Sequence, residues 1–365
     1  MATVVLQGVA KPANIGRQEP TGRTLYGERF DMTVLSLYPL RFEPIFKAAL
    51  WGGNKLKSWL RWGRPPKEPT GEAWVLSDHG DQVSRIVEGP LAGRSLREIL
   101  QLASEQILGR PLPPGKRFPL LLKFLDAREP LSIQVHPNDQ QAARFCQPGQ
   151  EARGKTEAWV VIEAEQDSQL LAGFKPGTRP ESARRAIREG TLLEHLHTIR
   201  PRPGDCIYIP AGTVHALGGG VMLFEVQQTS DLTFRLHDWG RVDARTGKPR
   251  ELHLDAGLAC TDFSQGPCHP VQPVVRRSEP VRQEQLLDCR HFSIWRYQGQ
   301  QAFSVGAMGA CRILVCLSGQ AHLHHQQQRY ALGPGDVLLL PACVGVCEIQ
   351  PRGLITLLEC GLPNE

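Results

Sequence analysis

The chain has 365 residues, of which 41% are hydrophobic and 22% are charged, a balance that is ordinary for a globular protein and sufficient for two or three compact units. The net charge of +5 is spread along the chain without a basic stripe or interleaved aromatic residues, so it does not favour a nucleic-acid partner. No apolar run approaches the roughly 20 residues of a membrane-spanning helix, so no membrane partner is expected either. A small molecule, with a mild preference for an anionic one, is the remaining class of ligand.

The N-terminal segment differs from the rest of the chain. Residues 1–31 are polar, contain Pro, Gly and charges of both signs, and lack the charged-then-apolar layout of a signal peptide. We therefore predict a flexible extension over residues 1–34. Met32 lies just before the first patterned strand, so a start of translation near this residue is an alternative interpretation.

Ten cysteines form no C-x-x-C pair, and most of them lie in apolar runs. This usage is typical of small buried side chains in a reducing compartment, and we expect the protein to be cytoplasmic. Disulfide pairing or metal binding is the less favoured interpretation, and it would involve Cys311, Cys316, Cys343 and Cys347.

Short runs with apolar residues at alternate positions predict strands along most of the chain. The clearest early runs are VLSLYPLRFEP (34–44), GEAWVLSDH (71–79), FPLLLKFLDA (118–127) and LSIQVHPND (131–139). Gly52 and Gly53 predict a tight turn between the first two runs. Residues 290–362 consist almost wholly of such runs separated by Gly and Pro, so the sequence predicts a mainly β protein built as a sandwich or barrel.

Helical signals are fewer. Ser95 and Glu98 form a capping-box pair before an amphipathic run that Gly109 ends. Asn138 is a suitable cap for a short helix through residue 145. These signals predict short helices between strands.

A further helix is predicted in the 180s. Thr178 and Glu181 have capping-box spacing, and Gly190 is a suitable stop. Together with the helix near residue 100, this segment is interpreted as a small helical insertion over about 94–110 and 178–200.

An internal repeat is present. PGDCIYIPAGTVHAL (203–217) and PGDVLLLPACVGVCE (334–348) share a Pro-Gly-Asp turn, an apolar strand and a second turn that begins with Pro-Ala. Two copies of one β unit are the simplest interpretation. The second copy has Val346 where the first has His215, so only the first copy is expected to carry polar groups inside.

Candidate metal ligands occur near predicted strands. Gln134 and His136 are two residues apart, as are Lys155 and Glu157, and residues two apart share one face of a strand. With His215 these side chains offer the nitrogen and oxygen ligands that suit zinc or a similar ion. Spacing alone leaves a metal site and ordinary core histidines equally open. A rival pair, His322 and His324 in AHLHH (321–325), is interpreted as an exposed strand end.

These motifs, in this order, resemble the type I mannose-6-phosphate isomerases, particularly the shorter bacterial form. The resemblance runs from about Leu37 to the C-terminus through YPLRFEPIFKAALWGG, GEAWVLSDH, KFLDAREPLSIQVHPND, GKTEAW and PAGTVHAL followed by FEVQQTSDLTFRLHDWGR. It implies tandem cupin (jelly-roll) barrels with a small helical insertion. The implied division is a catalytic cupin domain over 35–265 and a C-terminal cupin-like domain over 266–365 that lacks metal ligands.

The resemblance also implies roles for particular residues. It implies one Zn²⁺ per chain, held by Gln134, His136, Glu157 and His215. Arg235 and Lys155 match the family's active-site arginine and lysine, and either Lys155 or Glu225 is expected to move the proton, since burial would raise the pKa of Glu225. The expected substrate-binding residues are Lys123, Ser132, Asp231 and Arg241.

The implied activity is the interconversion of mannose 6-phosphate and fructose 6-phosphate through a cis-enediol. Two alternatives remain open at this point: a cupin that binds a sugar phosphate without turnover, and a metal-dependent cupin dioxygenase. The expected partner is a sugar phosphate, with no nucleic acid and no membrane, and the expected state is a monomer or a weak homodimer.

Overall fold

The computed structural model describes residues 36–146, 152–243 and 247–363. The predicted extension over residues 1–34, including Met32, lies outside these described residues. Strands dominate the described chain and the helices are few, so the prediction of a mainly β protein with a small helical content is confirmed. Each strand pairing of the sheets described below is antiparallel.

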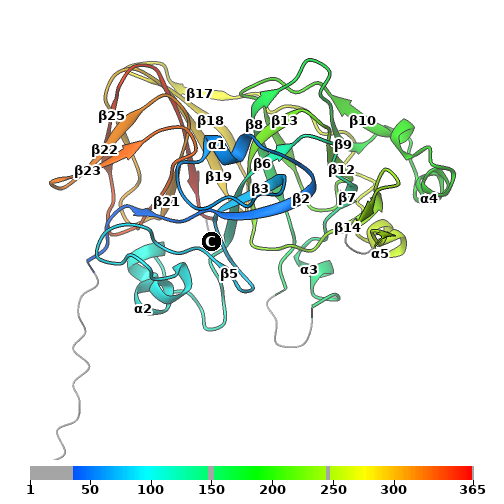
Figure 1. Ribbon diagram of the computed structural model, residues 1–365, viewed down its shortest axis with the longest axis horizontal. Helices are drawn as coiled ribbons and strands as arrows, with labels where there is room; N and C mark the ends of the chain where they lie inside the picture. Colours follow the sequence, from blue (N-terminus) through cyan, green and yellow to red (C-terminus); the bar gives the residue numbers. More distant parts are fainter. Residues whose placement is uncertain (1–35, 147–151, 244–246, 364–365) are drawn as a thin grey trace, which may run out of the picture. The chain divides into compact units, whose positions relative to one another are not determined.

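The N-terminal half forms two sheets (Figure 1). The six-stranded sheet has the order β11 (Cys206–Ile209), β8 (Glu157–Ala164), β13 (Val221–Gln228), β6 (Leu120–Ala127), β2 (Ile45–Gly53) and β3 (Thr70–Leu76). The five-stranded sheet has the order β10 (Leu196–Ile199), β9 (Leu170–Phe174), β12 (His215–Leu217), β7 (Ile133–Val135) and β14 (Phe234–His237).

The C-terminal half repeats this plan with two further sheets. The seven-stranded sheet has the order β1 (Leu40–Arg41), β24 (Val337–Leu340), β21 (Arg312–Ser318), β26 (Ile355–Gly361), β19 (Ser293–Gly299), β18 (Arg282–Asp288) and β17 (Val274–Arg277). The four-stranded sheet has the order β20 (Phe303–Val305), β25 (Cys347–Pro351), β22 (Ala321–His325) and β23 (Gln328–Leu332). Strand β1 comes from the start of the described chain, yet it pairs with β24 near its end. Two small ribbons complete the strands, β4 (Asp78–His79) with β5 (Gln82–Val83) and β15 (Val242–Asp243) with β16 (Lys248–Pro249).

A separate apolar core fills each sheet pair. In the N-terminal half, Trp51, Trp159 and Leu223 of the six-stranded sheet pack with Ala172 and Leu217 of the five-stranded sheet. In the C-terminal half, both sheets contribute aliphatic side chains such as Leu338 and Ile349 to a second core. Burial of these alternating apolar faces is the main force that holds the layers together.

The helices lie outside the sheets and are α1 (Lys55–Trp59), α2 (Leu96–Leu108), α3 (Asp139–Ala142), α4 (Pro180–Glu189) and α5 (Leu254–Cys260), with a 3₁₀ turn at Leu192–His195. Helices α4 and α5 cover the outer face of the five-stranded sheet, where Ala183 and Leu258 join Phe234 and Leu236 in a third apolar cluster (Figure 1). In the described part of the chain, the helices are too short and too polar to cross a lipid bilayer.

The helix ends test the predicted caps. Ser95 and Glu98 form the complete capping box of α2, and Gly109 ends that helix in a left-handed conformation, as predicted. Asn138 caps α3, but that helix ends at Ala142, earlier than predicted.

The predicted start of α4 at Thr178 is wrong. Arg179 is the N-cap residue, and its backbone N–H donates to the Ser182 hydroxyl at 2.9 Å. Pro180 explains the shift, because proline favours the first position of a helix and therefore fixes the cap at the residue before it. Gly190 ends this helix as predicted.

The tight turn predicted at Gly52 and Gly53 is also wrong, because β2 continues through both residues. A Cβ atom at Gly52 would lie 2.4 Å from the backbone nitrogen of Gly71. The glycine therefore permits a close approach of two strands, which is the other common reason for glycine inside a strand.

Both copies of the internal repeat form the same turn and strand. The Asp205 carboxylate accepts a hydrogen bond from the backbone N–H of Arg202 at 2.8 Å, and β11 follows. The Asp336 carboxylate accepts one from the N–H of Gly333 at 2.8 Å, and β24 follows. The two Pro-Gly-Asp segments are thus equivalent in local structure.

Candidate metal centre and active site

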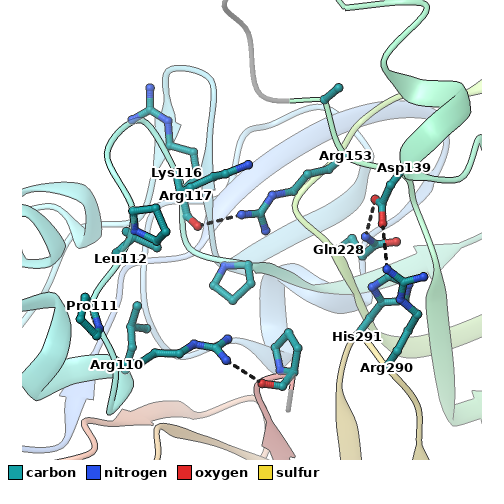
Figure 2. A pocket seen from close by; sticks show the side chains of 15 residues that line it. Arg110, Pro111, Leu112, Lys116, Arg117, Asp139, Arg153, Gln228, Arg290 and His291 are labelled. Carbon is teal, nitrogen blue, oxygen red and sulfur yellow. Dashed lines mark hydrogen bonds and ion pairs between the residues drawn. The ribbon is translucent and has the colours of Figure 1, made fainter. Parts of the chain in front are cut away.

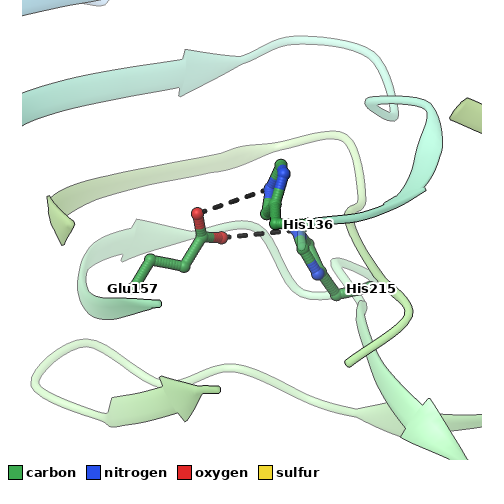
Figure 3. A group of neighbouring side chains, drawn as sticks. All are labelled: His136, Glu157 and His215. Atoms are coloured by element: carbon green, nitrogen blue, oxygen red, sulfur yellow. Dashed lines mark ion pairs between the residues drawn. The ribbon is translucent and has the colours of Figure 1, made fainter. Parts of the chain in front are cut away.

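Three side chains from separate strands converge inside the N-terminal half (Figure 3). His136 follows β7, Glu157 begins β8 and His215 begins β12, and all three are at most 1% exposed. The Glu157 carboxylate lies 3.6 Å from Nε2 of His136 and 3.3 Å from Nε2 of His215. One ligand atom from each residue lies within 4.8 Å of the others, a spacing that can hold a metal ion.

The second ring nitrogen of each histidine fixes the orientation of its ring. Nδ1 of His136 lies 2.8 Å from the carbonyl oxygen of Leu232, and Nδ1 of His215 lies 2.9 Å from that of Thr213. Because a carbonyl oxygen only accepts hydrogen bonds, each Nδ1 carries the proton and each Nε2 presents a lone pair toward Glu157. Metal-binding histidines are usually held in this way.

Electrostatics keep both imidazoles neutral. Burial is the largest cause that holds the pKa of His136 well below its usual value, and the positive charge of the Lys155 ammonium is the next largest. Burial lowers the pKa of His215 to about 4. A neutral imidazole is the form that binds a metal, so the pair is prepared for an ion at neutral pH.

Glu157 lacks a full set of partners among the described residues. Its Oε1 atom is buried and accepts no hydrogen bond from any of them. The Lys155 ammonium contacts Oε2 of Glu157 and lies 3.2 Å from Nε2 of His136. The unpartnered Oε1 of Glu157 and the two Nε2 atoms are therefore the donor atoms for a divalent cation.

Gln134 adjoins this group on β7, in register with His215 of β12. Its Nε2 atom lies 3.3 Å from Nε2 of His215, and its Oε1 accepts a hydrogen bond from the buried Ser132 hydroxyl at 3.3 Å. Ser132 therefore orients the amide of Gln134, and a ligand role for Gln134 stays a prediction.

A chain of alternating charges extends from Glu157 across the six-stranded sheet. Oε1 of Glu225 lies 3.6 Å from the Lys155 ammonium and 3.7 Å from that of Lys123, which lies 3.2 Å from the carboxylate of Glu72. Glu225 of β13 faces Lys123 of β6 in the strand register, which places both on one face of the sheet.

The environment shifts the pKa values of this chain in different directions. Burial, followed by the charge of Glu157, raises the pKa of Glu225. Burial favours neutral Lys123, but the carboxylates of Glu72 and Glu225 outweigh it and raise the lysine pKa. Burial likewise opposes ionisation of Glu72, yet Lys123 lowers its pKa below the usual value. Glu225 is thus the carboxylate with increased proton affinity.

The charged chain reaches the surface at a cavity of about 400 Å³. Glu72, Trp74 and the exposed Asp231 line this cavity. Trp74 donates to Glu72 at 2.6 Å, and the Lys123 ammonium lies 5.0 Å from the Trp74 ring centre. Our sequence reasoning did not single out Glu72 and Trp74, although their spacing of two in GEAW places them on one face of a strand.

Two predicted arginines, Arg235 and Arg241, donate hydrogen bonds to backbone carbonyl oxygens. Arg235 of β14 is in register with Gln134, but its Nη1 donates to the carbonyl oxygen of Glu251 at 2.9 Å. Burial, followed by the charge of Arg250, lowers the pKa of Arg235. In the described part of the chain, its Nε is buried without a hydrogen-bond partner.

Arg241 is held by structural contacts. Its Nη1 donates to the carbonyl oxygen of Pro130 at 2.7 Å, and its Nη2 lies 2.5 Å from the Asp238 carboxylate, which also pairs with Arg250. The substrate-binding role predicted for Arg241 has no support in these contacts and stays a prediction.

Fold and site together define a mainly β protein with a buried His/Glu/His group that suits a divalent metal. The family model for the catalytic domain of type I phosphomannose isomerase matches residues 40–174. The mannose-6-phosphate isomerase ManA of Bacillus subtilis is 33% identical over 86% of this chain and 96% of its own length. The chain therefore belongs to the type I phosphomannose isomerase family, which confirms the resemblance.

Two further comparisons agree. The probable mannose-6-phosphate isomerase GmuF of B. subtilis is 34% identical and covers the same shares, 86% of this chain and 96% of its own length. The crystal structure of the mannose 6-phosphate isomerase from B. subtilis superposes with a TM-score of 0.80 at 29% identity, covering 89% of this chain and 99% of that one.

Proposed function

We propose that this chain is a metal-dependent aldose-ketose isomerase that interconverts mannose 6-phosphate and fructose 6-phosphate. Its family membership supports the reaction class. The observation that carries the proposal is the buried group of His136, Glu157 and His215 beside the Lys155 ammonium and the Glu225 carboxylate. An isomerase needs such an arrangement, because it must stabilise negative charge and move a proton without an electron-transfer cofactor.

The proposed cofactor is one Zn²⁺ per chain, held by His136, Glu157 and His215 with Gln134 as a further ligand. The neutral imidazoles, their fixed Nε2 lone pairs and the unsatisfied Oε1 of Glu157 support this assignment. When bound, such an ion would act as a Lewis acid that favours negative charge on substrate oxygens.

The chain's own residues supply the proton transfer. In the open-chain aldose, a base removes the C2 proton, the C1–C2 double bond forms, and O1 gains a proton to give the cis-enediol. The O2 proton then leaves as the C2 carbonyl forms, and C1 receives a proton. Glu225 and Lys155 are the proposed proton carriers, and the raised pKa of Glu225 together with its position between two ammonium groups supports the carboxylate.

Substrate recognition is proposed at the side of the site that faces the cavity lined by Glu72 and Trp74. Lys123 and Ser132 would bind the phosphate, and Asp231 would bind sugar hydroxyls at the cavity. The Ser132 hydroxyl also holds the amide of Gln134. We retain Arg235 as the group that steadies the enediolate and Arg241 as a residue bordering the substrate. For Arg235, the support is its register with Gln134 and its buried, unpaired Nε.

We further propose two cupin (jelly-roll) domains over 35–265 and 266–365, each built on one sheet pair, with the helical insertion in the first. Strand β1 of the first range joins a sheet of the second. The separate cores of the two sheet pairs and their shared Pro-Gly-Asp unit support this division. All ten cysteines, each in the described part of the chain, are free thiols, which supports a cytoplasmic location. A monomer or weak homodimer is proposed for the oligomeric state.

The test is a coupled assay on mannose 6-phosphate with chelator-treated and metal-restored protein, together with elemental analysis. We expect loss of turnover on chelation, recovery with a divalent ion near one equivalent, and exchange of solvent deuterium into the substrate. Bound metal without turnover or exchange would instead indicate a binding module, and dependence on O₂ would indicate a dioxygenase. Turnover that ignores chelation in protein free of metal would contradict the mechanism.

A further inference from the structure

Trp159 of β8 is fully buried, with 0% exposure, and contacts two groups of the proposed active site. Its indole Nε1 donates a hydrogen bond to Oε2 of Glu225 at 3.1 Å. Its ring centre lies 5.4 Å from that of His215 at an interplanar angle of 72°, which is an edge-to-face contact. Trp159 thus adjoins both a proposed proton carrier and a proposed metal ligand.

The register of the six-stranded sheet produces this contact. Trp159 of β8 pairs directly with Glu225 of β13, and Glu225 pairs on its other side with Lys123 of β6. Residues directly opposite one another in antiparallel strands lie on the same face of the sheet, so the indole meets the carboxylate. Glu157 lies two residues before Trp159 on β8 and therefore shares that face. One strand face thus carries both the indole and a proposed metal ligand.

The two carboxylate oxygens of Glu225 have different surroundings. Oε2 accepts the hydrogen bond from the indole, whereas the buried Oε1 has no hydrogen-bond partner among the described residues. Oε1 lies 3.6 Å from the Lys155 ammonium and 3.7 Å from that of Lys123. Both distances exceed the roughly 2.7–3.2 Å of a normal hydrogen bond. The protein therefore occupies Oε2 and leaves Oε1 available for a proton.

The indole is a fixed donor, because its ring is packed in the core of the N-terminal half. Trp51, Leu125 and Leu223 belong to the same apolar cluster. Rotation of the ring away from Glu225 would open a cavity and leave a buried N–H without an acceptor, and both changes are unfavourable. The core packing thus holds the hydrogen bond to Oε2 in place.

The start of β8 is held as well. The backbone N–H of Thr156 donates to Oε1 of Gln228 at 3.0 Å, and the carbonyl oxygen of Thr156 accepts from the Gln228 N–H at 3.1 Å. The side-chain amide of Gln228 donates in turn to Asp139 at 2.9 Å, where both residues line a cavity of about 620 Å³ (Figure 2). Because β8 is fixed at Thr156 and at Trp159, Glu157 between them has little freedom to move.

From these contacts we propose that Trp159 is a positioning residue for proton transfer, which fixes Oε2 of Glu225 so that Oε1 moves the substrate proton. In the open-chain aldose, Oε1 takes the C2 proton while the electron pair of the C2–H bond forms the C1–C2 double bond and the carbonyl π pair moves to O1. In the last step, Oε1 returns its proton to C1. This inference rests on the proposed function and adds to it the atom that carries the proton.

A fixed carboxylate affects one part of the catalytic cycle in particular. Transfer of the proton requires a defined direction from Oε1 to the substrate carbon, and a small misplacement slows such a step strongly. Binding of the sugar phosphate does not require this direction. Loss of the indole hydrogen bond should therefore lower kcat and leave KM unchanged.

The test is Trp159→Phe in full-length, metal-loaded protein, a change that keeps a ring in the core and removes the N–H donor. We expect kcat to fall about tenfold, on the order of the contribution of one hydrogen bond to a charged group, with KM and metal content unchanged. Benzothienylalanine in place of Trp159 should have the same effect. In this analogue sulfur replaces the indole N–H, so the volume is kept and the cavity that phenylalanine leaves is avoided.

Trp62→Phe is the matched control. The Trp62 indole donates to Oδ1 of Asp336 at 3.0 Å, so this change removes the same kind of hydrogen bond outside the proposed active site. Turnover should stay at the wild-type value.

A double-mutant cycle separates positioning from a general structural effect. In a Glu225→Gln background, Trp159→Phe should lower kcat little further, because the indole acts through the carboxylate that this background lacks. Equal factors in both backgrounds would show that the indole does not act through Glu225, and the inference would be wrong.

The other outcomes are equally defined. The positioning role is wrong if both changes at Trp159 keep the wild-type kcat while Glu225→Gln loses turnover, and the isomerase proposal then stands. It is also wrong if metal content falls in parallel with kcat, because the indole would then act on His215. Full turnover of Glu225→Gln would remove Glu225 from the mechanism and this inference with it. Absence of turnover in the wild-type protein would overturn the proposed function itself, and the inference that rests on it.

Discussion

The two Pro-Gly-Asp units have the same backbone but different surroundings. Asp205, in the first unit, closes its own turn and is half-buried at the surface. Asp336, in the second, closes the same turn, is 1% exposed, and also binds three side chains from the start of the described chain: Arg41, Arg61 and Trp62. The same local motif thus serves as a simple turn in one half and as a long-range anchor in the other.

The interiors beside the two units also differ, because polar side chains lie beside the first unit and apolar side chains lie beside the second. Beyond its first turn, the N-terminal unit places His215 inside, where it meets Glu157 and His136. The C-terminal unit places Val346 at the equivalent position, where the side chain is 51% exposed, and the core beside it is apolar. The β unit therefore folds without polar ligands, and the metal group is an addition to the fold.

The strongest test of this contrast is Glu157→Gln. Loss of the carboxylate should reduce metal affinity and turnover by about 100-fold or more, since even indirect partners of a metal contribute about 10- to 100-fold. Elemental analysis and the coupled isomerase assay measure the two effects. The free energy of unfolding should also fall in the absence of metal, because the change leaves the buried Lys155 ammonium with one carboxylate partner, Glu225, in place of two.

Glu359→Gln in the other half is the matched control. Glu359 is 5% exposed, accepts a hydrogen bond from the Gly306 N–H at 2.8 Å, and lies 3.3 Å from Arg312. This substitution should leave metal content and turnover unchanged. Equal loss of metal in both variants would show that the two interiors are not independent.

The next largest effect is expected for the anchoring aspartate. Asp336→Asn should lower the free energy of unfolding by about 3 kcal/mol, because it leaves the buried Arg41 with one carboxylate partner, Glu88, in place of two. Asp205→Asn should cost under about 1 kcal/mol, since its carboxylate makes one local hydrogen bond near the surface. Urea denaturation of both variants measures the difference, and similar midpoints would refute the anchoring role.

Two buried carboxylates should give stability an opposite dependence on pH. Burial opposes ionisation of Asp238, but Arg250 and Arg241 outweigh burial and lower its pKa. Ionised Asp238 therefore stabilises the folded state at pH values above the usual Asp pKa of about 3.9, and this stabilisation is lost as pH falls through the lowered pKa. Burial raises the pKa of Glu359, so its contribution is greatest below the usual Glu value of about 4.3 and is lost as pH rises through the raised value.

Urea midpoints between pH 3 and 8 test this pair. Asp238→Asn should be less stable than wild type at neutral pH and converge with it in acid. The stability of Glu359→Gln relative to wild type should be highest at neutral pH and lowest in acid. If the stability of both variants relative to wild type changed with pH in the same direction, the assigned environments would be wrong.

The sequence predicts those parts of the site that depend on local spacing. His136, Glu157 and His215 could be proposed because residues two apart on strands share a face and carry ligand atoms. The capping box of Ser95 and Glu98 is local in the same way, and the structure confirms it.

Features that depend on tertiary packing could not be predicted. Glu72 looks like a solvated charge until β3 and β6 pair and place it beside Lys123. Gly52 looks like a turn residue until the backbone of Gly71 lies against it. No local pattern gives these pairings, because they are selected by the burial of whole sheet faces.

The smallest effect is expected from the reverse exchange, Val346→His. This change copies the histidine of the first unit into the second, but the second unit supplies no equivalent of Glu157 or His136 among the described residues near Val346. An exposed lone imidazole can hydrogen-bond to water and has little reason to bind a metal. Metal content should stay at the wild-type value. The free energy of unfolding, measured in urea, should change by less than about 0.5 kcal/mol, as for most surface substitutions. A second equivalent of bound metal would mean that the C-terminal half retains ligands that the comparison assigns only to the N-terminal half.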